Sequence, residues 1–344
     1  MKYSLIIPVY NRPDEVDELL ASLEAQTLKD FEVVVVEDGS TIPCLNIVNE
    51  HASRLALRYF QKENSGPGQS RNYGAERSQG EYLIVLDSDC VLPQGYLQAV
   101  DEELERRPSD AFGGPDRAHD SFTPVQKAIN YSMTSFFTTG GIRGGKKKLD
   151  KFYPRSFNMG VHSELYKRLG GFSAMRFGED IDFSIRIFKS GASCRLFPEA
   201  WVWHKRRTDM KKFFKQVHNS GIARINLMKR HPGSLKLVHL LPAIFTVGVV
   251  SLALLFVLGV VLFALGLCGW WVMVAALAPL LLYSVLIFVD SLVQNSSLKV
   301  AALSIYASFV QLLGYGTGFI RAWWLRCVCG RNEELQAFRD NFYQ

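Results

Sequence analysis

The chain has few cysteines, and their spacing matches no common cysteine-based site. Six cysteines are spread over 344 residues, at positions 44, 90, 194, 268, 327 and 329. Zinc ribbons use Cys-x-x-Cys pairs, and small secreted scaffolds contain a far higher density of cysteines. We therefore expect reduced thiols, and we assign neither a zinc site nor a disulfide framework.

Charged residues are missing from a long stretch in the second half of the chain. Residues 240–289 contain no Asp, Glu, Lys or Arg, and about 20 apolar residues are enough for a helix to cross the hydrocarbon. Two spans fit, at about 240–267 and 270–293, with Trp270 and Trp271 at the depth of a membrane interface. A buried hairpin of a soluble protein is the alternative, but soluble helices usually keep a polar face.

A third apolar segment, at about 300–325, is harder to place. It contains Gln311, three glycines and Arg321, and these residues interrupt the apolar run. The segment could span the membrane, re-enter it or lie in its interface. It completes a predicted membrane region at 238–326, which is followed by a polar tail at 327–344.

Acidic residues are scarce just before this membrane region. Residues 205–236 contain ten Lys or Arg and one acid, Asp209. Basic flanks are typical of the cytoplasmic side, and anionic head groups attract Lys and Arg by roughly 1 kcal/mol each. We therefore attribute the net charge of +6 to membrane lipids and not to nucleic acid. The apolar and basic residues of 208–230 predict a helix that lies on the membrane surface.

The N-terminus lacks the pattern of a secretory signal peptide. Its first apolar run is short, ends at Pro8 and Asn11, and has no small-residue cleavage pattern behind it. We expect the first 237 residues to stay in the cytoplasm. The predicted location is the cell (inner) membrane, with several spans and with the N-terminal domain on the cytoplasmic side.

Residues 1–230 alternate between β-rich and helical stretches. The expected strands are 3–9, 31–36, 56–60 and 82–86, and the expected helices lie near 14–26, 43–53 and 67–78. This order predicts an α/β domain with a mostly parallel, Rossmann-like sheet and helices on both faces. Ligands of such sheets bind beyond the C-terminal ends of the strands. The glycine- and lysine-rich stretch 138–151 predicts a mobile loop, which we interpret as a lid.

The fourth expected strand stops at two carboxylates. Asp87 and Asp89 flank Ser88 directly after an apolar run. Carboxylates in such a turn suit a hard divalent cation that also takes phosphate oxygens. An isolated Asp-x-Asp triplet is a weak signal, because short motifs match by chance and a solvated turn has the same composition.

Four further motifs accompany this triplet. They are "PVYN" at 8–11, "EDGS" at 37–40, "NSGPGQSRN" at 64–72 and "GED" at 178–180, the last close to a Gly-Gly-Phe. With these motifs in this order, the sequence resembles family 2 of the GT-A-fold glycosyltransferases over roughly residues 1–230. The resemblance implies a GT-A catalytic domain, followed here by the C-terminal transmembrane helical region.

The resemblance also implies a donor site. In that family the first loop and the second-strand acid hold the nucleotide base. This places Pro8, Tyr10 and Asp38 against the base, with Arg71 nearby. Glu37 stands where the family often has a second Asp or Asn, so its role is less defined than that of Asp38.

A metal ion, Mg²⁺ or Mn²⁺, is implied in the same way. Asp89 would bind the metal directly, and Asp87 would contact the ribose or reach the metal through water. A histidine after the last strand often supplies a third ligand in the family, and His204 is in a suitable place. A lone histidine beside tryptophan is also common as an ordinary packed residue.

The distal "GED" motif is expected to supply the catalytic base. Displacing a diphosphate from a sugar requires a group that takes the acceptor hydroxyl's proton, and a carboxylate in hydrogen-bond reach does this. The family places that base at Asp180, and Glu179 is a candidate acceptor contact. Asp182 and Arg186 are four residues apart, so they predict a structural pair along a helix. The family resemblance further implies a single in-line displacement that inverts the anomeric centre.

Together these features predict a metal-dependent, inverting glycosyltransferase, a hexosyl- or related transferase. It would move a sugar from a nucleotide-sugar donor to a lipid-linked glycan at the cytoplasmic membrane face, in cell-surface polysaccharide or glycolipid biosynthesis. One alternative is a polyprenyl-phosphate glycosyltransferase, and another is an inactive membrane scaffold that binds nucleotide. A processive synthase is disfavoured, because the Gln-x-x-Arg-Trp segment of that group is missing. The donor sugar, the base and the acceptor depend on pocket shape and stay open.

Overall fold

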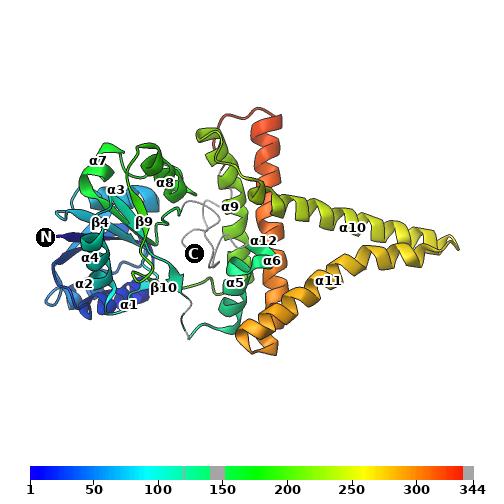
Figure 1. Cartoon of the computed structure of the whole chain (residues 1–344), viewed down its shortest axis with the longest axis horizontal. Helices are drawn as coiled ribbons and strands as arrows, with labels where there is room; N and C mark the ends of the chain where they lie inside the picture. The colour runs from blue at the N-terminus through cyan, green and yellow to red at the C-terminus, as the bar shows by residue number, and fades with distance from the viewer. Residues whose placement is uncertain (118, 120, 140–151, 336–344) are drawn as a thin grey trace. The chain divides into compact units, whose positions relative to one another are not determined.

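The computed structural model describes residues 1–344 except 118, 120, 140–151 and 336–344 (Figure 1). The predicted lid therefore lies almost entirely outside the described residues. The chain forms two units. The first comprises the described residues of Met1–Asp120 and Asp150–Lys205, and the second those of Ser121–Leu149 and Arg206–Phe342.

A seven-stranded sheet forms the centre of the first unit, in the order β3-β2-β1-β4-β8-β6-β9. Its strands are β1 (Tyr3–Val9), β2 (Phe31–Asp38), β3 (Leu57–Lys62), β4 (Tyr82–Leu86), β6 (Ala111–Gly113), β8 (Asn158–His162) and β9 (Cys194–Leu196). The first four are parallel to one another, whereas β8 is antiparallel to β4 and β6. The predicted mostly parallel sheet is confirmed.

Helices cover both faces of this sheet. They are α1 (Pro13–Glu24), α2 (Leu45–His51), α3 (Pro67–Ala75), α4 (Tyr96–Arg106), α7 (Ser163–Arg168) and α8 (Glu179–Lys189). Each central strand contributes to two cores: Leu5 and Ile7 pack with α1 and α4, while Ile6 packs on the other side with Phe183 of α8. Burial on both faces explains why these strands are continuously apolar and not alternating.

A second sheet of three short strands lies at the same edge of the first unit as the Asp-x-Asp turn. It consists of β5 (Cys90–Val91), β10 (Val202–His204) and β7 (Asp116–Arg117), in the order β5-β10-β7. β10 is antiparallel to β5, with His204 opposite Cys90. This pairing brings residues that are more than a hundred positions apart to one place.

The second unit is helical. It contains α5 (Pro124–Thr134), α6 (Phe136–Thr139), α9 (Met210–Arg230), η1 (Leu237–Leu240), α10 (Leu241–Ala264), α11 (Gly269–Asn295), α12 (Leu298–Trp323) and η2 (Trp324–Val328). Among the described residues, three stretches are long and apolar enough to cross a membrane: Leu237–Ala264, Gly269–Asn295 and Leu298–Val328. The predicted hairpin of two apolar helices is confirmed as α10 and α11.

The third apolar segment, which the sequence left open between a span, a re-entrant segment and an interfacial helix, forms one continuous helix, α12. The glycines that were expected to interrupt it lie where other backbones approach closely. A Cβ on Gly318 would lie 2.1 Å from the carbonyl oxygen of His218 in α9, and one on Gly316 would lie 2.3 Å from the carbonyl oxygen of Pro242 in α10. The glycines therefore permit close helix packing, as small residues do between membrane helices.

The helix predicted at 208–230 forms as α9. Its apolar face is covered by protein. Phe213, Val217 and Ile222 are at most 5% exposed, because they pack against α12 and, for Phe213 and Val217, also against α5. An amphipathic pattern shows that one face is covered, and here protein covers it.

Candidate active site

The parallel strands place several predicted site residues at one edge of the sheet. β1, β2 and β4 are neighbours, and their C-terminal ends lead into Tyr10, Asp38 and Asp87. Pro8 lies within β1 and pairs in register with Val36 of β2. The carboxyl edge of such a sheet is where ligands of α/β proteins bind.

Asp38 organises the loop that follows β3. It is buried, and its carboxylate accepts hydrogen bonds from the backbone N–H groups of Ser65 and Gly66, both at 2.9 Å. Lys62 forms an ion pair with the same carboxylate. The carboxylate thus holds the start of α3, on which Arg71 lies. Glu37, by contrast, accepts from the backbone N–H of Cys44 at 2.8 Å, so its side chain ties β2 to the next turn.

Asn11 connects the first two loops, a role that the sequence did not reveal. Its backbone is left-handed, with φ of 52°, which asparagine tolerates better than most residues. Its side-chain oxygen accepts hydrogen bonds from the backbone N–H groups of Thr41 and Ile42, at 2.8 and 2.9 Å. The "PVYN" loop and the "EDGS" loop are therefore one hydrogen-bonded structure.

Asp89 lies between two cationic or potentially cationic side chains. His204 Nε2 is 3.1 Å from one carboxylate oxygen, and Arg12 Nη1 donates to the other at 2.9 Å. The position of His204 follows from the pairing of β10 with β5, and its ring stacks on Phe157 at 4.9 Å between centroids. The sequence suggested His204 from the family pattern, but nothing in it pointed to Arg12.

The donor atoms around Asp89 fit a divalent metal ion. Ligand atoms of Asp89, Cys90 and His204 all lie within 4.8 Å of one another. Carboxylate and imidazole groups are ligands that Mn²⁺ takes. Cys90 is a poor third ligand, because its thiol is fully buried, contacts the carbonyl oxygen of Phe157 at 3.5 Å, and has a pKa that burial raises well above its ordinary value. Asp89 and His204 are thus the better pair.

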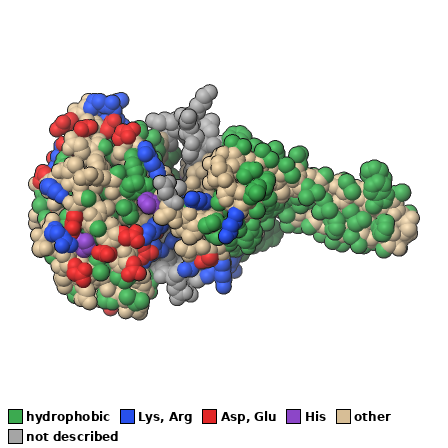
Figure 2. Space-filling model, turned by 90° about the horizontal axis from the view of Figure 1, so that it is seen from below, with side chains coloured by type: hydrophobic (Ala, Val, Ile, Leu, Met, Phe, Trp, Pro, Cys, Tyr) green, Lys and Arg blue, Asp and Glu red, His purple; other side chains and the backbone are tan. Residues whose placement is uncertain are grey.

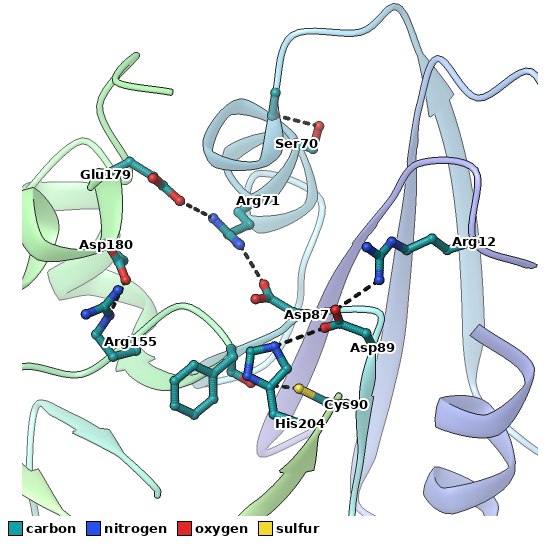
Figure 3. Close-up of polar contacts among 12 residues, drawn as sticks. Arg12, Ser70, Arg71, Asp87, Asp89, Cys90, Arg155, Glu179, Asp180 and His204 are labelled. Atoms are coloured by element: carbon teal, nitrogen blue, oxygen red, sulfur yellow. Dashed lines mark hydrogen bonds and ion pairs between the residues drawn. The ribbon is translucent and has the colours of Figure 1, made fainter. Parts of the chain in front are cut away.

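Arg71 links the Asp-x-Asp turn to the "GED" motif. Its guanidinium donates to Asp87 at 2.7 Å and to Glu179 at 2.8 Å (Figure 3). It also lies over the ring of Phe172. The side chain is 3% exposed, so both ion pairs lie in a region of low dielectric constant. The family resemblance implies that Arg71 lies near the nucleotide base, and this stays a prediction. In the structure Arg71 directly contacts the acids of two motifs.

Asp180 and Glu179 begin α8, directly after Gly178. Gly178 is in the left-handed region, with φ of 80°, which glycine adopts without strain. Asp180 accepts from Arg155 Nε at 2.6 Å and from its neighbour's backbone N–H at 2.8 Å. The predicted pair along α8 is confirmed as well, since Arg186 lies 2.9 Å from Asp182.

The pKa values of the two neighbouring acids shift in opposite directions. Burial raises the pKa of Glu179, the negative charge of Asp180 adds to this shift, and Arg71 opposes it. For Asp180, burial alone would raise the pKa, but the charge of Arg155 and the hydrogen bonds outweigh burial and lower it. Asp180 is therefore the more acidic of the two carboxyl groups. Such an opposed pair, joined through Arg71 to Asp87, is an arrangement that can accept a proton beside a metal–phosphate site.

Arg155 is a further residue that sequence reasoning missed, after Asn11 and Arg12. Only its Nε contacts Asp180, and its side chain is 36% exposed beside otherwise buried acids. No motif marks it, because it meets Asp180 only after β8 and α8 have folded onto the sheet.

Comparison with known proteins agrees with this geometry. The glycosyl transferase family 2 profile matches residues 4–170. An uncharacterized glycosyltransferase of Haemophilus influenzae is 30% identical over 195 residues, which are 54% of this chain and 62% of the relative. The poly(ribitol-phosphate) beta-N-acetylglucosaminyltransferase TarS of Staphylococcus aureus is 37% identical over 116 residues, 33% of this chain and 20% of TarS. The chain thus spans less than two thirds of the length of either relative.

A solved structure supports the fold across both units. The mannosyltransferase PcManGT of Pyrobaculum calidifontis superposes with a TM-score of 0.57 and 17% identity, and the match covers 94% of this chain and 87% of that protein. At this identity the likeness is one of fold. Residues 4–170 therefore match the glycosyl transferase family 2 profile, and the chain has a GT-A-like fold.

Proposed function

We propose that this chain is a metal-dependent, inverting glycosyltransferase that uses a nucleotide-sugar donor. The observation that carries the proposal is the bridge from Asp87 through Arg71 to Glu179, which joins the predicted donor–metal motif to the predicted base motif. A purely structural ion pair would not require charged residues from three sequence motifs, two acids and one arginine, at the carboxyl edge of the sheet. Catalysis by displacement does require a donor site and a base side by side.

The donor half of the site is assigned to the first two loops. Pro8, Tyr10 and Asp38 would face the nucleotide base, and the Asn11 hydrogen bonds keep both loops in one arrangement. Asp87 would face the ribose or a metal-bound water. Loops that are rigid before the donor arrives lose less conformational entropy when they bind it.

The metal is assigned to Asp89 and His204, with Asp87 beside them. When bound, the metal would neutralise the charge that develops on the departing nucleoside diphosphate. Arg12 already pairs with Asp89, and it would keep that carboxylate oriented while donor and metal enter. PcManGT is described in complex with GDP-Man and Mn²⁺, so Mn²⁺ is the first metal to test.

The base is assigned to Asp180. Because its pKa is lowered, it is ionised near neutral pH and can accept the acceptor hydroxyl's proton. Arg155 holds one of its oxygens, which orients the carboxylate and leaves lone pairs for the acceptor. Glu179 is buried and paired to Arg71, and we assign it to orienting the acceptor side of the site.

The acceptor is assigned to the membrane. The three long apolar helices support a multi-pass membrane protein, and the basic residues before α10 support a cytoplasmic active site. We propose a lipid-linked glycan as acceptor, in cell-surface polysaccharide or glycolipid biosynthesis. TarS is named for transfer to poly(ribitol-phosphate), so a polyol-phosphate chain belongs in the acceptor panel.

The test is release of nucleoside diphosphate by the purified protein from UDP-, GDP- and TDP-sugars, with Mn²⁺, Mg²⁺ or EDTA. The expected result is metal-dependent release from one donor, increased by lipid extract and lost in Asp89→Ala and Asp180→Asn. Asp14→Asn, an exposed acid on α1, is the control and should keep full activity. Donor binding without release under any condition would contradict the proposal and favour the inactive scaffold.

The product separates the two enzymatic readings. The transferred sugar is radiolabelled. If mild acid releases the label from the lipid as a single sugar, the enzyme is a polyprenyl-phosphate glycosyltransferase. Radiolabel in an extended, acid-stable glycan supports the proposed function.

A further inference from the structure

Within the second unit, α12 runs across the base of the α10–α11 hairpin and not alongside it. Near its start, Ser304 accepts a hydrogen bond at 2.7 Å from Ser291, which is close to the end of α11. Twelve residues later, Gly316 lies against Pro242, at the start of α10. These two contacts are about 18 Å apart along α12. The helix therefore passes from the foot of one hairpin helix to the foot of the other.

The rest of the hairpin projects away from this base. Near the turn, α10 and α11 contact one another, since a Cβ on Gly269 would lie 2.1 Å from the carbonyl oxygen of Gly259. Their side chains there are exposed, for example Phe263 at 59% and Val274 at 51%. Figure 1 shows α10 and α11 leaving α9 and α12 and converging at the turn, and Figure 2 shows the hairpin covered by hydrophobic side chains.

The hairpin has the length of a bilayer crossing. From residue 247 to Ala264, α10 extends for about 27 Å, and the hydrocarbon core is about 30 Å thick. Its charged residues begin only at the base, where Asp290 accepts a hydrogen bond from Tyr131 of α5 at 2.6 Å. The stacked Trp270 and Trp271 lie at the opposite end, just after the turn.

The packing of α9 against α12 limits where α12 can lie in the membrane. The two helices pack in parallel from Phe213 and Val310 to Asn226 and Arg326, the last pair hydrogen-bonded at 2.8 Å. If α12 crossed the hydrocarbon, α9 would enter it too, together with the lysines and arginines along its length: 211, 212, 215, 224, 229 and 230. Lysine and arginine at the bilayer centre are strongly unfavourable, whereas at the head groups they are attracted by anionic lipid.

From these contacts we propose that only α10 and α11 cross the bilayer, while α9 and α12 lie together in the plane of the adjacent head groups. α12 is then an interfacial helix and not a third span. The partner of this surface is an anionic phospholipid leaflet. The inference concerns membrane placement, and it holds whichever sugar is transferred.

α6 extends the same surface into the lipid. Phe136 is 72% exposed and Phe137 39% exposed, although both are large and apolar. The hydroxyl of Tyr283 donates to the carbonyl oxygen of Phe137 at 3.3 Å. Tyr283 is two helical turns, about 10 Å, farther along the hairpin than Asp290. Phe136 and Phe137 are therefore placed below the head groups, at the level of the hydrocarbon.

Two natural cysteines test the number of crossings. Cys268 lies in the hairpin turn and Cys329 follows α12, and both are exposed. Two variants are treated with a membrane-impermeant maleimide. One keeps Cys268 and has Ser at 194, 327 and 329, and the other keeps Cys329 and has Ser at 194, 268 and 327. Intact cells and inverted vesicles are compared. We expect Cys268 and Cys329 to react from opposite sides. Reaction of both from the same side would show three crossings and overturn the proposal.

The orientation of α12 has its own test in nanodiscs that contain anionic lipid. A fluorophore is attached through Ala302→Cys or Thr317→Cys, both exposed, and its depth is measured by quenching with spin-labelled lipids. The two positions should lie within about 10 Å of the same depth, whereas a spanning helix would separate them by about 22 Å. Leu254→Cys is the deep control, and Phe136→Cys should be deeper than Ala302→Cys. A separation above about 10 Å, or a water-exposed label at 136, would refute the arrangement.

Discussion

Replacing Arg71 by Met should destabilise the first unit more than any surface change of equal size. Arg71 is 3% exposed and pairs at 2.7 and 2.8 Å with Asp87 and Glu179. Methionine fills a similar volume but leaves the two carboxylates without their counter-charge. Breaking a buried pair in this way costs about 3–5 kcal/mol. Asp87 is 29% exposed and water compensates part of its loss, so the lower half of that range is expected.

The assay is thermal unfolding in detergent, followed by tryptophan fluorescence. For a unit of this size, 1 kcal/mol shifts Tm by about 2–4 °C, so a fall of roughly 10 °C is expected. Arg106→Met is the matched control, because Arg106 is 70% exposed and its ion pair with Glu103 lies at the surface. Exposed pairs contribute about 0–1 kcal/mol, so the control should change Tm by at most a few degrees.

A second variant tests the cause of the effect. Adding Glu179→Gln to Arg71→Met removes one of the stranded charges, so the double variant should recover several degrees relative to Arg71→Met alone. The reasoning would be refuted if Arg71→Met unfolded at the same temperature as Arg106→Met. It would also be refuted if Glu179→Gln made the Arg71 variant less stable still.

Further predictions concern the metal, the base, a titrating side chain and a helix contact. Asp89→Ala should abolish Mn²⁺ binding in the presence of donor, measured by electron paramagnetic resonance of free Mn²⁺. Asp180→Asn should keep donor affinity in calorimetry yet lower turnover by about 10²–10⁴-fold, the usual contribution of a general base. His51 is 6% exposed; burial would lower its pKa, but hydrogen bonds to two carboxylates outweigh burial and raise it, the partners being Asp17 and Glu24. This contact contributes fully to the free energy of unfolding below the unfolded pKa of about 6.5, and its contribution is lost as pH rises through the raised folded pKa. His51→Gln should therefore lower the free energy of unfolding more at about pH 5.5 than at about pH 9. Gly318→Leu should separate α9 from α12, because its Cβ would lie 2.1 Å from a backbone oxygen, and we expect loss of the detergent-stable fold in size-exclusion chromatography.

The fold of the first unit could be predicted well from local patterns. Apolar runs such as 82–86 matched their strand to the residue, because a strand buried on both faces requires such a run. The motif residues could be placed at strand ends for a simple geometric reason: parallel strands end at the same edge. That reasoning placed Asp38 and Asp87 at one edge of the sheet, whereas Asp180, in the first turn of α8, was placed by the family resemblance.

The contacts made by long side chains could not be predicted in this way. Arg12 contacts Asp89, 77 residues away in the chain. Arg155 contacts Asp180, 25 residues away. No sequence periodicity predicts contacts between residues so far apart. The same is true of His204, whose place depends on the small sheet of β5, β10 and β7. A family pattern suggested it, but only the pairing of β10 with β5 explains it.

For the membrane unit, the amino-acid order alone was enough to identify a two-helix hairpin, since no charge interrupts residues 240–289 and hydrocarbon excludes charge. The direction of α12 relative to the hairpin depends on its tertiary contacts with the other helices. An apolar helix face is shielded from water, but the sequence does not show whether lipid or protein shields it. The glycines at 314, 316 and 318 looked like interruptions, and they became contact points only when α9 and α10 were packed against them.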